Sequence, residues 1–323
     1  DHAPALLVGG RLSTVQSLLE RFDPAWAAGS PDLHYVRGLL AWARWDFDAM
    51  NGAMQRAQEL WQTAGDGDRA QLAFAYRSLS MVGQARADRI DNDRLVQARS
   101  AADLETRLIA LLASQWRALE TGDLRSIGPL LDAQMDLLET TSDLSLWYRA
   151  HTVPRLNGLN GTGRGLDRYV DGALRRTAGQ ITPLRAMAQA QRALRETWQG
   201  LADTAEQTLT DARADARWLG NPPNVSGNLR LAGMLVAAHR GRHQETVLAA
   251  RSLITDHLPY RGPWSHAFMM FYAARAVAAF DDREALNEHL TRLESLQHRV
   301  PPAVVAMIEP LRGIRAWLDR DTT

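Results

Sequence analysis

The chain has 323 residues, with 37 basic and 37 acidic side chains and a formal net charge of zero at pH 7. The charge balance argues against a nucleic-acid-binding surface over the whole chain, because such surfaces carry excess Lys and Arg. An apolar content of 46% permits a buried core and makes global disorder the less favoured state.

Two residue types are absent from the sequence, and both absences exclude chemistry. Every basic residue other than His is Arg, so no lysine can serve a P-loop phosphate or a Schiff base. The absence of Cys removes disulfides, thiolate zinc sites and cysteine nucleophiles. It also fits a reducing compartment, and no signal-peptide pattern opens the chain. These features predict a cytoplasmic location.

In chain order, the sequence consists of amphipathic stretches of roughly 15–20 residues, rich in Ala, Leu, Arg, Glu and Gln. Short breaks that contain Gly, Asp, Asn or Pro separate these stretches, and alternating runs of Val, Ile and Thr hardly occur. This pattern predicts an all-α fold. Residues 267–280 are nearly apolar but include Arg275 and are too few to cross a bilayer, so they predict a buried helix.

One type of break recurs along the chain, as a small or polar turn between two predicted helices. Successive breaks lie 35 to 41 residues apart, and four of the seven spacings are 39. A repeated helix, tight turn and second helix predicts an α-solenoid, a right-handed superhelix of about eight helical hairpins. The breaks begin at Gly10, Trp45, Gly83, Gly122, Gly161, Gly200, Gly241 and Phe280.

The predicted hairpins carry the residues that contacts between helices require. Gly38 lies seven residues before its turn, where two helices must approach closely, and Ala57 lies where a second helix meets the next unit. Aromatic side chains in a helical solenoid belong mostly to the core. We therefore expect Trp61, Trp218 and Trp317, which lie late in their helices, to pack between units.

Small residues at helix contacts and Gly-Asp-aromatic-like turns resemble the tetratricopeptide repeat, although the period here is about 39 rather than about 34 residues. The longer units look like the start of the sensor region of MalT-like regulators, the large ATP-binding LuxR-family transcription activators of bacteria. The resemblance covers essentially all of the chain. The segments that carry it are 7–12, 18–19, 31–33, 37–42 and 46–49.

This resemblance implies a domain organisation. In that family, a signal-transduction NTPase module precedes a superhelical array of long tetratricopeptide-like repeats, and a helix-turn-helix ends the chain. Here no Walker motif is present, and residues 315–320 do not continue into a DNA-binding domain. We therefore expect residues 1–323 to be a single sensor domain excised from a longer regulator, with 302–323 as a terminal capping helix. ATP is expected only in a separate module, and no cofactor is expected in this chain.

Other motifs in the sequence are better explained by local structure than by a functional site. Residues 161–165 resemble a glycine-rich phosphate loop, but they follow no strand and fall in register with the other breaks, so they predict a turn. His239 and His243 have the spacing of a helical metal pair, but Gly241 breaks the helix between them. We therefore expect no metal site. No Gly-x-Ser-x-Gly nucleophile elbow is present.

Counting back from each turn selects positions on the first helix of each unit that would face the concave interior. The selected side chains are mostly aromatic or polar, which suits a groove that stacks a ligand and hydrogen-bonds it. Tyr148, His151 and Arg155 fall on one predicted helix face beside Pro154, which should bend or break the helix. The alternative for each position is packing within its own hairpin. The candidate ligand-binding residues are Tyr35, Trp42, Arg77, Trp116, Tyr148, His151, Arg155, Asn228 and Met270.

The resemblance implies effector sensing, in which a small molecule inside the superhelix shifts the regulator between inactive and active states. An aromatic interior would suit a sugar, a medium-sized alcohol or an aromatic compound. The first alternative is a protein-interaction scaffold that holds a partner peptide in the concave groove. An enzyme would need a convergent set of titratable residues with a nucleophile or base, which the sequence lacks. The expected partners are the effector and other domains of the regulator, with self-association open and no direct nucleic-acid or membrane contact.

Overall fold

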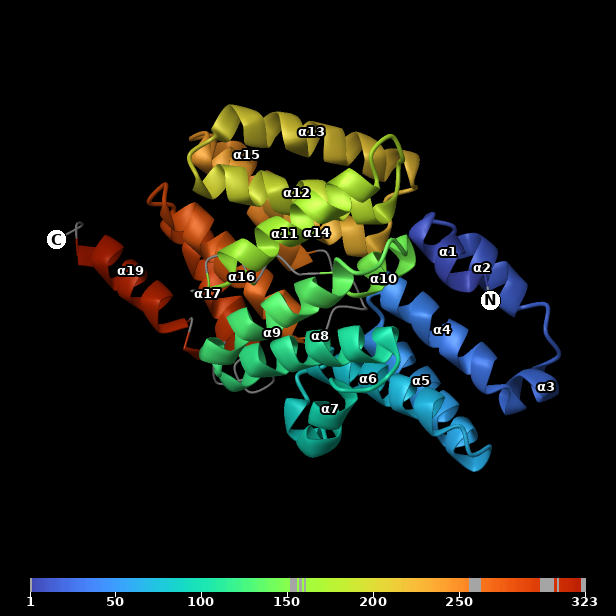
Figure 1. Ribbon diagram of the computed structural model, residues 1–323. Coiled ribbons are helices and arrows are strands. Elements are labelled where there is room, and N and C mark those ends of the chain that lie inside the picture. Colours follow the sequence, from blue (N-terminus) through green and yellow to red (C-terminus); the bar gives the residue numbers. More distant parts are fainter. Residues whose placement is uncertain are drawn as a thin grey trace.

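The computed structural model describes residues 2–151, 156, 159, 161–255, 263–296, 305–306 and 308–320. All regular structure in these residues is helical, and they contain no strand, which confirms the predicted all-α class. No helix among them is long and apolar enough to cross a membrane. Figure 1 shows the helices stacked side by side, and most of them pack against a neighbour in the chain.

The helices differ in length, from one and a half turns to five. The first half contains α1 (Ala3–Val8), α2 (Leu12–Leu19), α3 (Pro24–Gly29), α4 (Pro31–Arg44), α5 (Phe47–Thr63), α6 (Gly67–Gly83), the 3-10 turn η1 (Ala87–Arg89), α7 (Asn92–Ala98), α8 (Leu104–Thr121), α9 (Leu124–Leu138) and α10 (Leu144–Arg149). The second half contains α11 (Gly163–Arg176), α12 (Pro183–Trp198), α13 (Ala202–Trp218), α14 (Pro223–His239), α15 (His243–Thr255), α16 (Pro263–Ala278), α17 (Arg283–Leu296) and α19 (Ile308–Arg320).

All eight predicted breaks contain a residue with a positive φ, so the predicted turn positions are confirmed. Glycine suits this left-handed conformation because it has no Cβ, and five of the eight residues are Gly. Trp45 ends α4 in the same conformation, with a φ of 59°. The eight residues are Gly10, Trp45, Ala85, Gly122, Gly161, Gly200, Gly241 and Asp281.

Aspartate side chains begin several of the helices. Asp46 accepts a hydrogen bond from the amide of Ala49 at 2.9 Å, and Asp66 accepts one from the amide of Arg69 at 3.1 Å. Such a cap satisfies an amide that the helix itself leaves without a partner. The same arrangement starts α8, where Asp103 accepts from the amide of Thr106. The sequence therefore places both ends of the hairpin helices by local chemistry.

Contacts within and between hairpins follow the predicted small residues. A Cβ added to Gly38 would lie 2.5 Å from the terminal methyl of Met54, which confirms a close approach of α4 and α5. Ala57 is fully buried against α6. Trp61 belongs to the same small cluster, as predicted.

Two of the three tryptophans expected between units are instead exposed. Trp218 is 70% exposed and Trp317 is 59% exposed, so the prediction for them was wrong. The buried stripe of α13 includes Leu209, Ala212 and Ala216, and Trp218 falls on the opposite side of that stripe. Position late in a helix is thus a poorer guide to burial than helical periodicity.

The helix that carries Tyr148 is shorter than the predicted helix face. It ends at Arg149, so His151 lies beyond the helix and does not share a helical face with Tyr148, contrary to the prediction. Pro154 has no amide hydrogen to donate to the carbonyl of Ala150. That carbonyl instead accepts a hydrogen bond from Nε2 of Gln134 on α9. Pro154 and the predicted site residue Arg155 lie outside the described residues.

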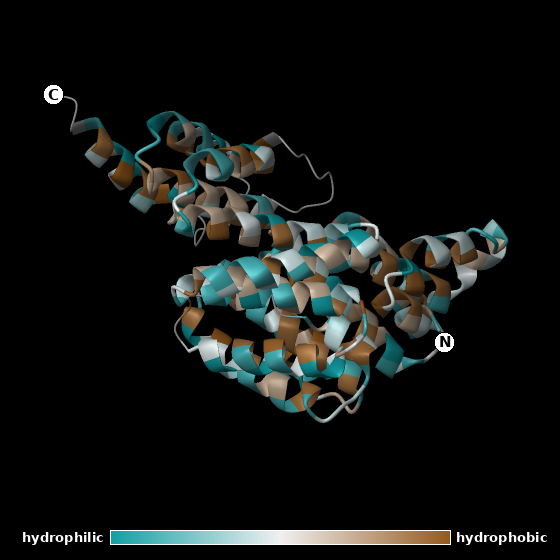
Figure 2. Ribbon diagram, turned by 90° about the horizontal axis from the view of Figure 1, so that it is seen from above, coloured by the Kyte–Doolittle hydropathy of each residue, from teal (hydrophilic) through white to brown (hydrophobic). Residues whose placement is uncertain are grey.

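Helices far apart in the sequence meet across the interior. Helix α4 contacts α14, and α6 contacts α16. At the N-terminal end, α1 packs on α10, and a Cβ on Gly10 would lie 2.8 Å from the side chain of Leu219. A continuous apolar cluster extends from Leu7 to Leu318. Figure 2, a view from above, shows hydrophobic and hydrophilic residues alternating along the outer helices, as expected for helices with one buried face.

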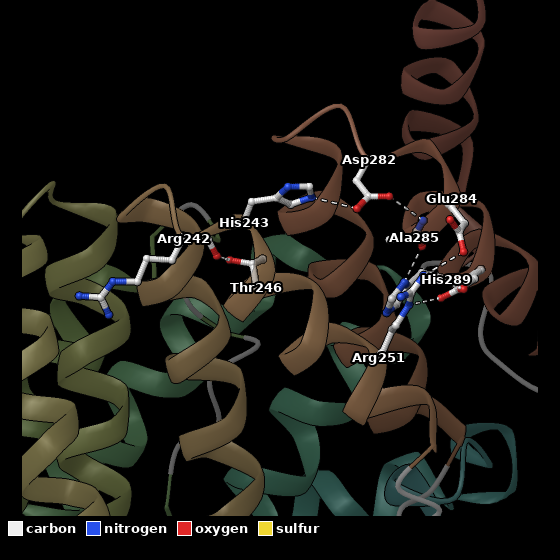
Figure 3. A network of polar contacts seen from close by, with 9 residues as sticks. Arg242, His243, Thr246, Arg251, Asp282, Glu284, Ala285 and His289 are labelled. Carbon is white, nitrogen blue, oxygen red and sulfur yellow. Dashed lines mark hydrogen bonds and ion pairs between the residues drawn. The ribbon is translucent and has the colours of Figure 1, made fainter.

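Polar contacts join α15 and α17 near the C-terminal end of the chain (Figure 3). His243 lies 2.9 Å from Oδ2 of Asp282, and Arg251 binds both carboxylate oxygens of Glu288. The buried ring of His289 lies between the carbonyl oxygens of Ala285 and Ala250, at 2.7 and 3.0 Å. Residues 308–320 within the predicted capping segment form α19, which packs on α17 and α16.

Candidate functional site

Four of the predicted ligand-binding side chains meet in the interior. Helices α4 and α8 supply Trp42 and Trp116, α10 supplies Tyr148, and His151 follows the end of α10. The ring centroids of Trp42 and Trp116 lie 5.9 Å apart, and those of Trp42 and His151 lie 5.1 Å apart. His151 also stacks on Tyr148 at 6.4 Å. We call these four side chains, with Trp45 and Phe47, the aromatic core.

Trp45 and Phe47 complete the aromatic core from the turn between α4 and α5. Trp45 stacks on Trp42 at 6.3 Å and on His151 at 6.2 Å, and Phe47 meets Trp116 edge-on at 6.1 Å. Sequence reasoning used these two residues only to mark a turn. Trp45 is a bulky aromatic residue at a turn position that Gly usually occupies. A positive φ at such a residue is strained and persists only when packing compensates for the strain, so the tryptophan itself indicates a packed environment.

Helix α14 carries two buried asparagines, one of which contacts the aromatic core. Asn224 donates a hydrogen bond from Nδ2 to the hydroxyl of Tyr148 at 2.7 Å. Burial raises the pKa of Tyr148 well above its usual value, although the hydrogen bond from Asn224 opposes this rise. The predicted site residue Asn228 is buried one turn further along, and its Nδ2 has no hydrogen-bond partner among the described residues.

The side chains of the aromatic core are almost completely enclosed. Trp42, Trp116, Tyr148 and His151 are each at most 2% exposed. Such burial favours tight packing over an open concave groove at this level of the molecule. Hollows lined by described residues lie elsewhere, between α15 and α17, between α11 and α12, and over α7, α8 and α9.

A second polar centre lies beside the predicted residue Tyr35. The hydroxyls of Tyr35 and Tyr76 both donate to Oε1 of Glu105 at 2.6 Å, and Arg149 forms an ion pair with its Oε2 at 3.1 Å. Helices α4, α6, α8 and α10 each contribute one of these four side chains. We call this group the Glu105 centre.

Burial governs the ionisation of the Glu105 centre. It raises the pKa of both tyrosines well above the usual value, and the negative charge of Glu105 raises it further. Burial alone would lower the pKa of Arg149, but Tyr76 and Glu105 outweigh it and the net shift is upward. The Nε and Nη1 atoms of Arg149 are buried without hydrogen-bond partners among the described residues. Sequence reasoning missed Tyr76, Glu105 and Arg149 because no motif connects them.

The remaining predicted residues do not join either group in the contacts described. Arg77 on α6 lies near Glu59 of α5 and Arg94 of α7, with a buried Nε that has no partner among the described residues. Met270 on α16 is fully buried in the apolar cluster. Arg155 lies outside the described residues.

The glycine-rich segment forms a turn. Gly161 has a φ of 82°, and α11 starts two residues later, at Gly163. The hydroxyl of Thr162 donates to the carbonyls of Leu156 and Leu159 at 2.8 Å. The described part of the chain contains no group of three His, Asp or Glu side chains that could hold a metal ion.

No protein-family model, curated protein or solved structure matches this chain. The candidate site therefore depends on the geometry of its own residues.

Proposed function

We propose that this chain is the effector-binding sensor domain of a MalT-like transcription activator, folded as a right-handed superhelix of about eight tetratricopeptide-like hairpins. The effector is a small molecule that binds at the aromatic core, and ATP and DNA are handled by other modules of the regulator. The observation that carries this proposal is the convergence of Trp42, Trp116, Tyr148 and His151, which come from three hairpins, on one interior position.

The contacts across the interior suggest how binding would act on the regulator. Helices α4 and α14 lie some 180 residues apart in the sequence but touch beside the aromatic core. Because the aromatic core is tightly packed, a ligand inserted between Trp42 and α14 would bind an opened arrangement of these helices more tightly than the packed one. Such differential affinity is the physical requirement for an effector to shift a conformational equilibrium.

The polar atoms of the core restrict the ligand class. Nε1 of Trp45 and Nδ2 of Asn228 are buried donors without partners among the described residues. A ligand that satisfies them must offer acceptor oxygens, and the aromatic rings favour a compact apolar face. Both requirements are met by a sugar or a medium-sized alcohol. The burial of the predicted groove residues gives less support to a scaffold that holds an extended peptide.

A thermal-shift screen of sugars, alcohols and aromatic compounds tests the proposal. A compound present at about 100 times its Kd stabilises the folded state by about 2.7 kcal/mol, so a true effector raises Tm measurably. We expect one of these compound classes to stabilise the protein. Absence of stabilisation by every small molecule, together with binding of a peptide, would contradict the sensor proposal and favour the scaffold.

The variant Asn228→Leu sharpens this test. It removes a buried donor that has no partner among the described residues, so it should leave the stability of the ligand-free protein unchanged or slightly increased. The same variant should lose most of the ligand-induced shift. The matched variant Asn224→Leu breaks the hydrogen bond to Tyr148 and should instead lower the ligand-free Tm. If the Asn228→Leu protein keeps the full ligand-induced shift in Tm, Asn228 does not contact the ligand.

A further inference from the structure

A shortened helix leaves a hollow on the surface of the third and fourth predicted hairpins. Helix α7 has 7 residues, whereas the corresponding second helices α5 and α9 have 17 and 15. It packs on α6 and α8 and lies below them in Figure 1. A second helix of ordinary length would cover more of α8 and α9. The space that α7 does not fill is the hollow.

The hollow has a polar part and an apolar part that share residues. The polar part has a volume of about 240 Å³ and is lined by Arg99, Ser114, Arg117 and Ser126, among others. The apolar part is an open groove of about 530 Å³. Val96, Arg99, Ser126 and Leu130 line both parts, so the two adjoin. The apolar walls are Val96, Leu111, Pro129, Leu130 and Ala133.

Three arginines face this hollow without carboxylate partners. Within the described part of the chain, no acidic side chain forms an ion pair with Arg99, Arg117 or Arg125. Nε of Arg117 is also buried and lacks a hydrogen-bond partner there. The one acidic residue of the lining, Asp123, already accepts a hydrogen bond from Ser126 at 2.6 Å.

Several arginines elsewhere on the outer surface pair with carboxylates of the neighbouring helix. Arg168 of α11 binds Asp136 and Glu139 of α9, each at 2.8 Å. Arg242, which precedes α15, binds Glu206 of α13 through two nitrogens. In the α7 hollow the arginines line an unfilled space instead of meeting a carboxylate of the next helix. An anion in that space would neutralise their charge and satisfy the buried donor of Arg117.

We propose that the α7 hollow binds a small amphiphilic anion, a carboxylate or phosphate attached to an aliphatic chain. The anionic head occupies the polar part against Arg99 and Arg117, and the chain lies along Val96 and Leu130 in the groove. The volume of the groove falls in the range of about 300–1,000 Å³ that is usual for small-molecule sites. This site is separate from the aromatic core and does not depend on the proposed effector.

Calorimetric titration of the whole chain with hexanoate, octanoate and decanoate tests this proposal. Each added methylene that enters the groove should tighten binding about fourfold, equivalent to about 0.8 kcal/mol. The uncharged 1-octanol should bind at least tenfold more weakly than octanoate. Inorganic phosphate should bind more weakly than octyl phosphate. Equal affinity of octanol and octanoate, or of phosphate and octyl phosphate, would overturn the proposal.

Matched arginine variants locate the site. Arg117→Gln should weaken octanoate binding at least tenfold, whereas Arg217→Gln, at an exposed position on α13, should leave it unchanged. Circular dichroism establishes that both variants are folded. If the Arg117→Gln variant does not fold, Arg99→Gln provides a second test of the same site. Unaltered octanoate affinity in folded Arg117→Gln or Arg99→Gln protein would overturn the assignment. Binding of the protein to phosphatidylglycerol vesicles without binding of monomeric octanoate would also overturn it.

Discussion

Glu105 and Arg149 form an ion pair that is mostly removed from water. The side chain of Arg149 is 5% exposed and that of Glu105 is 16% exposed. Removing one member of such a pair leaves the other charge in a poorly solvated place, which costs more free energy than the pair itself contributes. The surface pair of Arg56 and Glu59 is half exposed on both sides and has no such consequence.

Glu105→Gln therefore tests the Glu105 centre. We expect the free energy of unfolding to fall by roughly 3 kcal/mol, because Arg149 loses its counter-ion while Tyr35 and Tyr76 lose a charged acceptor. Urea denaturation measures the change, and Glu59→Gln is the matched control, for which we expect no measurable loss. Equal effects of the two substitutions would show that the Glu105 centre is not buried as described.

Some residues of the candidate site can be predicted from the sequence, and others cannot. Counting back from the regular turns predicts Trp42, Trp116, Tyr148 and His151 as interior residues, and the structure brings them together. Arg149 could not be found in this way, because its importance depends on a partner 44 residues earlier in the chain. Pairing between distant helices leaves no local pattern in one sequence.

At the scale of helices, glycine has two different roles that only packing distinguishes. Gly128 on α9 faces the turn at Gly161, and a Cβ there would lie 2.9 Å from the carbonyl oxygen of Gly161. Gly52 on α5 has no atom within 4 Å of the same added Cβ. Both lie inside helices, where Gly is intrinsically less favourable than Ala by roughly 0.5–1 kcal/mol.

The two alanine substitutions should consequently have opposite signs. Gly52→Ala should stabilise the protein by up to about 1 kcal/mol, since the new methyl meets only solvent. Gly128→Ala should destabilise it, because a rigid backbone carbonyl must move away. Chemical denaturation of both variants measures the two changes. A stabilising Gly128→Ala would contradict the close contact between α9 and the Gly161 turn.

The regular spacing predicted the turns but not the irregular helices. Positive-φ residues recur at all eight predicted breaks because the turn chemistry is local. Helices α7 and α10 are much shorter than the period implies. For α10 the physical reason is visible in the sequence, since Pro154 cannot donate to the carbonyl of Ala150. For α7, the spacing between breaks does not reveal the short helix, because longer connecting segments keep the repeat length nearly constant.

At the scale of the whole molecule, α4 contacts α14, α6 contacts α16, and the large interior side chains are buried. Burial raises the pKa of Tyr35, Tyr76, Tyr148 and Tyr169. A raised pKa in the folded state means that the unfolded chain ionises first as pH increases. The associated stability is therefore fully present below the unfolded value of about 10 and is lost as pH rises beyond it.

Alkaline titration tests this enclosure. We expect most tyrosinate absorbance at 295 nm to develop together with the loss of helical circular dichroism above about pH 10, because the four buried hydroxyls ionise only when the chain unfolds. Below that pH neither signal should change. Ionisation of most tyrosines while the helical signal persists would contradict a closed interior.

The central claim is that a small effector binds at the aromatic core, and fluorine NMR of protein labelled with 5-fluorotryptophan tests it most directly. Substitutions to Phe assign the resonances of Trp42, Trp45 and Trp116 in the core and of the exposed Trp218 and Trp317. On titration with the stabilising compound, the three core resonances should shift in proportion to occupancy while the two exposed ones remain unchanged. Shifts confined to Trp218 or Trp317, with the core resonances unmoved at saturation, would contradict the account.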